Sequence, residues 1–129
     1  MSLRYQRYWL ALGFLWVAIV IFFSLMPNPP QPMAFEQSDK VSHLLAYACL
    51  MLWFCQLYGG VARRWGLALA FVALGVGLEY LQDLTPYRTF DVLDMAANTG
   101  GVLLGWVLAA TPLGRGLQLL EVHGLGRCA

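Results

Sequence analysis

The stretch YWLALGFLWVAIVIFFSLM, residues 8–26, decides the fold class because it contains no charged side chain. A bilayer core of about 30 Å is crossed by a helix of about 20 mostly apolar residues. The stretch ends at a proline cluster that begins at Pro27, and proline cannot continue a helix. Arg4 and Arg7 give it the basic start of a signal peptide, but no small-residue cleavage motif follows it. We therefore expect a retained membrane anchor.

Three further stretches match the first in length and apolar content, at residues 41–58, 65–82 and 92–110. Only helices and closed barrels satisfy the backbone in lipid, so apolar runs joined by short loops predict helices. Of the 129 residues 12% are charged, against about 25% in a typical soluble domain. The sequence predicts an all-α polytopic membrane protein, a four-transmembrane-helix bundle. A single domain covers residues 1–129, with 111–129 as a cytoplasmic tail that forms a short interfacial helix or frays.

Basic residues are unevenly divided between the two ends of this predicted bundle. With four spans, both termini and the second loop share one side, which carries Arg4, Arg7, Arg63, Arg64, Arg115 and Arg127. The first and third loops hold only Lys40 and Arg88, together with most of the acids. Lys and Arg accumulate on the cytoplasmic side of a membrane. The sequence therefore predicts that both termini are cytoplasmic and that the acid-rich end faces the periplasm or exterior.

Polar side chains gather at this outer end of three predicted helices. Asp39, His43 and Tyr47 are spaced i, i+4, i+8, which places them on one helix face, and Glu79 and Gln82 end the third helix. A charge below the head groups costs at least about 2.5 kcal/mol unless it is paired or hydrated. This cost favours one shared pocket over separate defects facing lipid. The predicted ligand-binding residues are Asp39, Lys40, His43, Tyr47, Glu79, Gln82, Arg88, Asp91, Asp94 and Asn98.

A purely structural interpretation stays open for several of these residues. His43 also fits a hydrogen-bonded core histidine, and Asp91 fits the N-cap of the fourth helix, a favoured position for Asp. Glu79 and Asp94 are the hardest to explain in this way, because apolar side chains pack a membrane helix at lower cost. We expect both acids to converge with His43. A buried network that only specifies packing remains an alternative.

Few other features of the sequence bear on cofactors or partners. The three cysteines, Cys49, Cys55 and Cys128, show no disulfide framework or zinc pattern, and we predict no metal and no cofactor. A net charge of +1 gives no signal for nucleic acid. The expected partners are membrane lipids or a lipid-linked envelope precursor. Gly101 and Gly105 form a Gly-x-x-x-Gly pair typical of close helix packing, through which the chain could also form an oligomer.

Five short motifs follow one another from the end of the first span. They are Ser-Leu-Met-Pro at 24–27, Asp-Lys-x-x-His-x-x-x-Tyr at 39–47, Glu-x-x-Gln at 79–82, Arg-x-x-Asp-x-x-Asp at 88–94 and Asn-x-x-Gly-x-x-x-Gly at 98–105. In order and spacing they resemble the VanZ-like family of small bacterial membrane proteins. The resemblance implies a multi-pass protein of the bacterial cytoplasmic (inner) membrane. The family is named for an association with resistance to the glycopeptide teicoplanin, which implies a role at the cell envelope but no known reaction.

Several functions fit this pattern. In the first, the pocket binds or modifies a lipid head group or lipid-linked wall precursor, with Arg88 and Lys40 holding its phosphate or carboxylate. In the second, His43, Glu79 and Asp94 run acid–base or metal chemistry on a phosphate ester, as in a hydrolase or transferase. The sequence contains no His-Glu-x-x-His motif in support of that reading. A transporter and a passive structural accessory subunit complete the alternatives.

Overall fold

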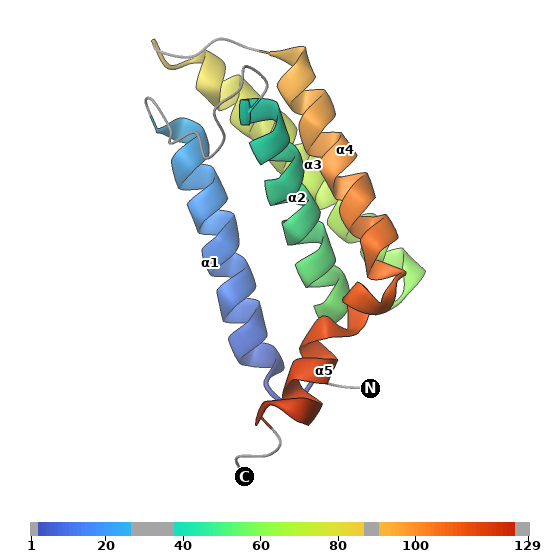
Figure 1. Cartoon of the computed structure of the whole chain (residues 1–129). Helices are drawn as coiled ribbons and strands as arrows, with labels where there is room; N and C mark the ends of the chain where they lie inside the picture. Colours follow the sequence, from blue (N-terminus) through green and yellow to red (C-terminus); the bar gives the residue numbers. More distant parts are fainter. Residues whose placement is uncertain (1–2, 27–37, 87–90, 126–129) are drawn as a thin grey trace.

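The computed structural model describes residues 3–26, 38–86 and 91–125, without the side chains of Ser38 and Asp39. All secondary structure in these ranges is helical. Four helices are long and apolar enough to cross a membrane, which confirms the predicted all-α, four-helix fold. Figure 1 shows the elements, which are α1 (Gln6–Leu25), α2 (Ser38–Leu57), α3 (Val61–Asp83), α4 (Val92–Ala109), the 3-10 helix η1 (Pro112–Arg115) and α5 (Gly116–His123).

The helices begin up to four residues earlier than the sequence predicted, most of all in α3. This helix starts at Val61, and Arg63 and Arg64 belong to its first turn, because arginine is compatible with helix although it ends the apolar run. Gly60 precedes the helix with a φ of 97°, a left-handed conformation that glycine adopts without steric cost. The turn between α2 and α3 therefore depends on this glycine.

Helix α2 lies at the centre of the bundle. In Figure 1 it runs between α1 and α4, with α3 behind. Of its membrane-spanning window 39% is buried, against 17% for α1. Tyr47, Leu50 and Met51 on α2 are at most 1% exposed. The core of the protein is therefore built around α2, and α1 is its most peripheral span.

Two glycines lie where α4 packs against α2, the most extensive contact between any two described helices. A Cβ atom on Gly101 would collide with the carbonyl oxygen of Leu44, and one on Gly105 would collide with that of Ala48. Small residues at such positions let helix backbones touch. The Gly-x-x-x-Gly pair thus packs against α2 of the same chain, and its use in an oligomer stays a prediction.

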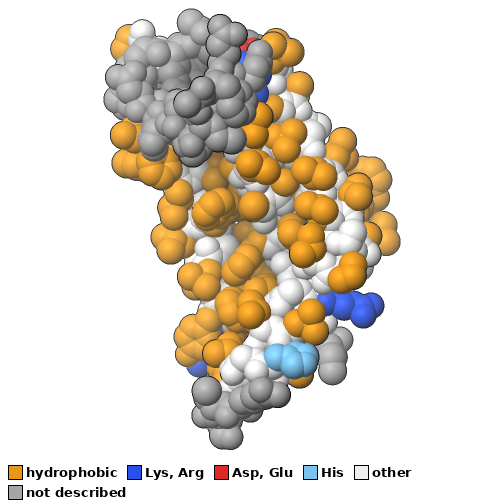
Figure 2. Space-filling model, viewed as in Figure 1, with side chains coloured by type: hydrophobic (Ala, Val, Ile, Leu, Met, Phe, Trp, Pro, Cys, Tyr) orange, Lys and Arg blue, Asp and Glu red, His pale blue; other side chains and the backbone are white. Residues whose placement is uncertain are grey.

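The outside of the bundle is apolar. Large hydrophobic side chains such as Phe14, Phe22, Leu69 and Leu103 are 58–68% exposed, and hydrophobic side chains cover most of the middle of the face shown in Figure 2. A soluble monomer rarely exposes so much contiguous apolar surface. In a protein with four membrane-length helices, these side chains face lipid.

The segment after α4 folds back as a helix. Glu121 on α5 accepts hydrogen bonds from the backbone N–H groups of Arg4 and Tyr5, at 2.8 and 2.9 Å, and from Trp9 Nε1 at 2.7 Å. Burial opposes ionisation of this carboxyl, but the three bonds outweigh it and hold its pKa below the usual value. Both termini lie at one end of the bundle, beside α5 (Figure 1). Their cytoplasmic location stays a prediction.

Candidate functional site

The predicted site residues occupy one end of the bundle, here called the polar end. It comprises the C-terminal ends of α1 and α3 and the N-terminal ends of α2 and α4. Because these four helix ends come together, polar residues that the sequence places on separate helices lie close to one another. The described contributors are Ser24 on α1, Lys40, His43 and Tyr47 on α2, Glu79 and Gln82 on α3, and Asp91, Asp94 and Asn98 at or on α4.

Lys40 links α2 to two carboxylates at the start of α4. Its Nζ lies 3.2 Å from Asp91 Oδ2 and 3.5 Å from Asp94 Oδ1. The Asp91 side chain also caps α4, accepting the backbone N–H of Leu93 at 2.9 Å. The Leu93 N–H and the Lys40 ammonium lower the pKa of Asp91. Asp91 is thus both the predicted N-cap and a member of the charged cluster.

Glu79 is the most deeply buried acid of the cluster, at 1% exposure. Its Oε1 accepts the backbone N–H of Asp91 at 2.8 Å, so the carboxylate lies against the start of α4, where the helix dipole favours negative charge. It is also close enough to Asp94 and His43 to interact with both electrostatically. The structure therefore brings together the three residues that the sequence predicted to converge.

His43 and Asn98 connect α2 and α4 deeper in the bundle than the ion pairs of Lys40. His43 Nδ1 lies 3.0 Å from Asn98 Oδ1, a hydrogen bond in which the histidine nitrogen donates to the amide oxygen. Asn98 is 3% exposed and fits beside Gly75 of α3, where a Cβ would come within 3.0 Å of Asn98 Nδ2. The absence of a side chain at Gly75 is therefore what lets this amide reach the histidine.

Gln82 extends the network to α1. Its Nε2 donates to the carbonyl oxygen of Ser24 at 2.6 Å, and both residues are buried. Sequence reasoning did not assign Ser24 to the site, although this residue opens the Ser-Leu-Met-Pro motif that closes the first span. Tyr47 is 1% exposed and lies close enough to Glu79 for its hydroxyl to interact electrostatically with the Glu79 carboxylate. All four spans thus contribute to the polar end.

Two predicted site residues are not placed by the structure: Arg88 and the side chain of Asp39 lie outside the described residues. The described part of the cluster contains three carboxylates and a single ammonium, that of Lys40, which contacts two of them. Among the residues described, no group of three or more His, Cys, Asp or Glu side chains is arranged to hold a metal ion.

Exposure divides the polar end into a surface layer and a buried layer. The side chains of Lys40 and Asp91 are 23% and 37% exposed, whereas Glu79, Gln82 and Asn98 are at most 3% exposed. A ligand would therefore meet the Lys40–Asp91 ion pair first.

Comparison with known proteins identifies the family. The VanZ/LLP1 family model matches residues 17–113. The chain belongs to the VanZ/LLP1 family. The matched region runs from the middle of α1 to η1 and contains every predicted site residue, so the polar end lies within the part of the chain shared with the VanZ/LLP1 family.

One relative of the chain comes from a fungus. The protein C11E3.10 of Schizosaccharomyces pombe, described as uncharacterized, is 29% identical to this chain over 121 residues. The match covers 91% of this chain and 72% of the yeast protein. Because this relative comes from a fungus, a bacterial cytoplasmic membrane does not follow from the resemblance alone and stays a prediction. No solved structure matches the chain.

Proposed function

We propose that this VanZ/LLP1 protein binds the polar head group of a lipid, either a membrane phospholipid or a lipid-linked envelope precursor, at the polar end. The observation that carries the proposal is the burial of Glu79, Gln82, Asp94 and Asn98, each at most 8% exposed, in membrane-length helices. Apolar side chains would pack there at lower cost. Intramembrane ionisable residues are by default candidates for a functional site.

The Lys40–Asp91 ion pair is the proposed point of contact. A ligand phosphate would replace Asp91 at the Lys40 ammonium, and the released Asp91 carboxylate would then accept a hydrogen bond from the ligand. Because carboxylates outnumber the ammonium in the described cluster, a head group with its own donor beside the phosphate fits better than a bare phosphate. Amine, hydroxyl and amide groups meet this requirement, and Arg88 is the predicted second cation.

The predicted orientation gives this site a biological setting. If the basic end is cytoplasmic, the polar end opens toward the periplasm or exterior, where wall precursors are exposed. Binding there would connect the protein to the cell envelope and, through the precursors on which glycopeptides act, to teicoplanin resistance.

Two phospholipids test the proposal on purified full-length protein in detergent. Phosphatidylethanolamine carries an amine that can donate to Asp91, and phosphatidylcholine carries a quaternary nitrogen that cannot. We expect native mass spectrometry to show about tenfold tighter binding of phosphatidylethanolamine, the effect of one charge-assisted hydrogen bond. Asp91→Asn should remove most of this preference, whereas Lys40→Gln should weaken the binding of both lipids.

Arg7→Gln serves as the matched control for the loss of one charge. Arg7 is exposed at the opposite end of the bundle, where its guanidinium stacks on Tyr8, so its replacement should leave binding unchanged. Unaltered lipid preference in the Asp91 variant and unaltered affinity in the Lys40 variant, together with reduced stability, would instead support a network that only specifies packing.

A further inference from the structure

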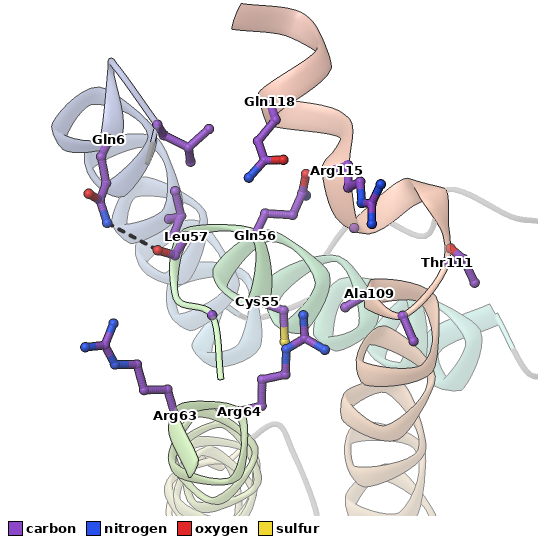
Figure 3. A pocket seen from close by; sticks show the side chains of 14 residues that line it. Gln6, Cys55, Gln56, Leu57, Arg63, Arg64, Ala109, Thr111, Arg115 and Gln118 are labelled. Atoms are coloured by element: carbon purple, nitrogen blue, oxygen red, sulfur yellow. Dashed lines mark hydrogen bonds between the residues drawn. The ribbon is translucent and has the colours of Figure 1, made fainter. Parts of the chain in front are cut away.

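The opposite end of the bundle contains a cavity of about 670 Å³. It lies where α2 ends, α3 begins and η1 crosses beneath α4, and we call it the arginine cavity. Figure 3 shows side chains from these elements and from α1 and α5 around the space. None of the described lining residues is acidic, and the polar ones include Gln6, Gln56, Arg63, Arg64, Arg115 and Gln118.

The start of α3 makes this cavity electropositive. Arg63 and Arg64 both lie in the first turn, where the helix dipole already contributes positive charge. The N-cap residue Gly60 provides no side-chain hydrogen bond, and the first turn contains no acid. Two cations at an uncapped helix N-terminus are electrostatically unfavourable unless an anion joins them.

The arginines of the cavity are not neutralised within the part of the chain that the structure describes. No ion pair there involves Arg63, Arg64 or Arg115; the ion pairs found are those of Lys40 at the polar end. In addition, Arg64 Nε is shielded from solvent and has no hydrogen-bond acceptor among the described residues. A buried N–H group without an acceptor is costly, so the described residues leave this donor unsatisfied.

We propose that the arginine cavity binds a phosphate-bearing anion, supplied either by the head group of an anionic phospholipid or by a soluble phosphate compound. Guanidinium groups bind phosphate oxygens in pairs, and Arg63, Arg64 and Arg115 approach the space from α3 and η1 (Figure 3). The volume falls within the range of about 300–1,000 Å³ usual for small-molecule sites. Basic pockets between membrane helices commonly receive lipid head groups.

The same helices thus carry two separate sites at their opposite ends. The polar end offers acids that accept hydrogen bonds from a ligand, whereas the arginine cavity offers guanidinium donors and no carboxylate in its described lining. The proposal for the cavity does not depend on the proposal for the polar end, because none of its lining residues belongs to the Lys40 cluster.

Two probes and four variants of the full chain test the cavity. Phosphatidylglycerol, with phosphatidylcholine as the zwitterionic reference, is titrated in native mass spectrometry, and inorganic phosphate is titrated by calorimetry. We expect selective binding of phosphatidylglycerol, weakened about tenfold by Arg63→Gln or Arg115→Gln. Both arginines are exposed, so these variants should keep the native helical circular dichroism.

Arg7→Gln and Lys40→Gln are the controls. The first removes the same charge at the same end but outside the cavity, and the second removes the cation of the polar end; each should change phosphatidylglycerol affinity by less than about twofold. Phosphate binding with the same arginine dependence would show that a soluble ligand suffices, and its absence would assign the site to lipid. If neither probe binds, or if Arg7→Gln weakens binding as much as Arg115→Gln, the proposal is wrong.

Discussion

The two ends of the bundle treat charge in opposite ways. At the polar end, acids and bases from three helices lie within reach of one another, and Lys40 contacts two carboxylates at once. At the arginine cavity, three guanidinium groups surround a space whose described lining contains no acid. One end therefore pairs much of its charge within the chain, whereas the described lining of the other carries charge of one sign only. The comparison teaches that one bundle can pair charge internally at one end and leave charge unpaired at the other.

The largest expected effect comes from disrupting the close packing of α4 against α2, on which both ends of the bundle depend. Gly105→Leu places a side chain against the Ala48 carbonyl oxygen and the Met51 Cβ, so we expect unfolding in detergent to become easier by about 3 kcal/mol. Ligand binding at both ends should fall together. Gly77→Leu is the control, since nothing lies within 4 Å of a Cβ there. Equal stability of the two variants would contradict the tight α2–α4 packing.

A smaller loss is expected at the polar end alone. Glu79→Leu removes the acceptor of the Asp91 N–H, and the loss of this part-buried hydrogen bond should lower the free energy of unfolding by about 2 kcal/mol. Glu79→Gln keeps an acceptor oxygen and should lose less. Denaturant titration of both variants measures the difference, and a leucine variant as stable as the glutamine variant would show that this hydrogen bond contributes little.

Loss of a hydrogen bond at the end that carries α5 should lower the free energy of unfolding by about 1 kcal/mol. Trp9→Phe keeps the aromatic ring but removes the N–H that donates to Glu121. Trp65→Phe is the matched control, because Trp65 is exposed and its ring contact with Trp106 survives the change. Thermal unfolding monitored by circular dichroism compares the two, and a similar shift in both would argue against the Glu121 contact.

Lowering the pH should have the smallest effect on stability. A protonated carboxyl still accepts hydrogen bonds, so protonation weakens the contacts of both ends without removing them. Glu121 and Asp91 have folded-state pKa values below their usual 4.5 and 3.8. Their stabilisation is complete above those usual values and is lost as the pH falls through the lowered ones. Stability measured from pH 6 downward should therefore begin to decline near pH 4.5.

Variants separate the contributions of the two ends to this pH profile. Glu121→Gln should flatten the decline that begins near pH 4.5, and Asp91→Asn should flatten the part that begins near pH 3.8. If neither variant alters the profile, these carboxylates do not contribute to the pH dependence.

The spans and much of the polar end were predictable because they depend on local patterns. Apolar length gave four helices, and i, i+4 spacing placed His43 and Tyr47 on one face. The hydrogen bond between Gln82 and the Ser24 carbonyl was not predictable, since it joins residues 58 positions apart and involves a main-chain atom. Spacing within a helix says nothing about which carbonyl of another helix lies opposite.

The arginine cavity was missed for a related reason. Arg63, Arg64 and Arg115 were recognised in the sequence, but only as markers of membrane orientation. Their place around one cavity depends on the turn at Gly60 and on the path of η1 after Thr111, whose side chain accepts the Leu113 N–H. Hydropathy does not determine the geometry of these connections. The sequence therefore did not predict that the three arginines line one cavity.

The contact of Glu121 with the segment before α1 also constrains how the protein is assembled. Of the four described spans, α1 is synthesised first and is the least buried, yet the carboxylate that fastens its start belongs to α5, which is synthesised after all four. Bonds from α2 and α3 can hold α1 as soon as those spans are made, but the start of α1 gains its contact with Glu121 only when translation has passed residue 121.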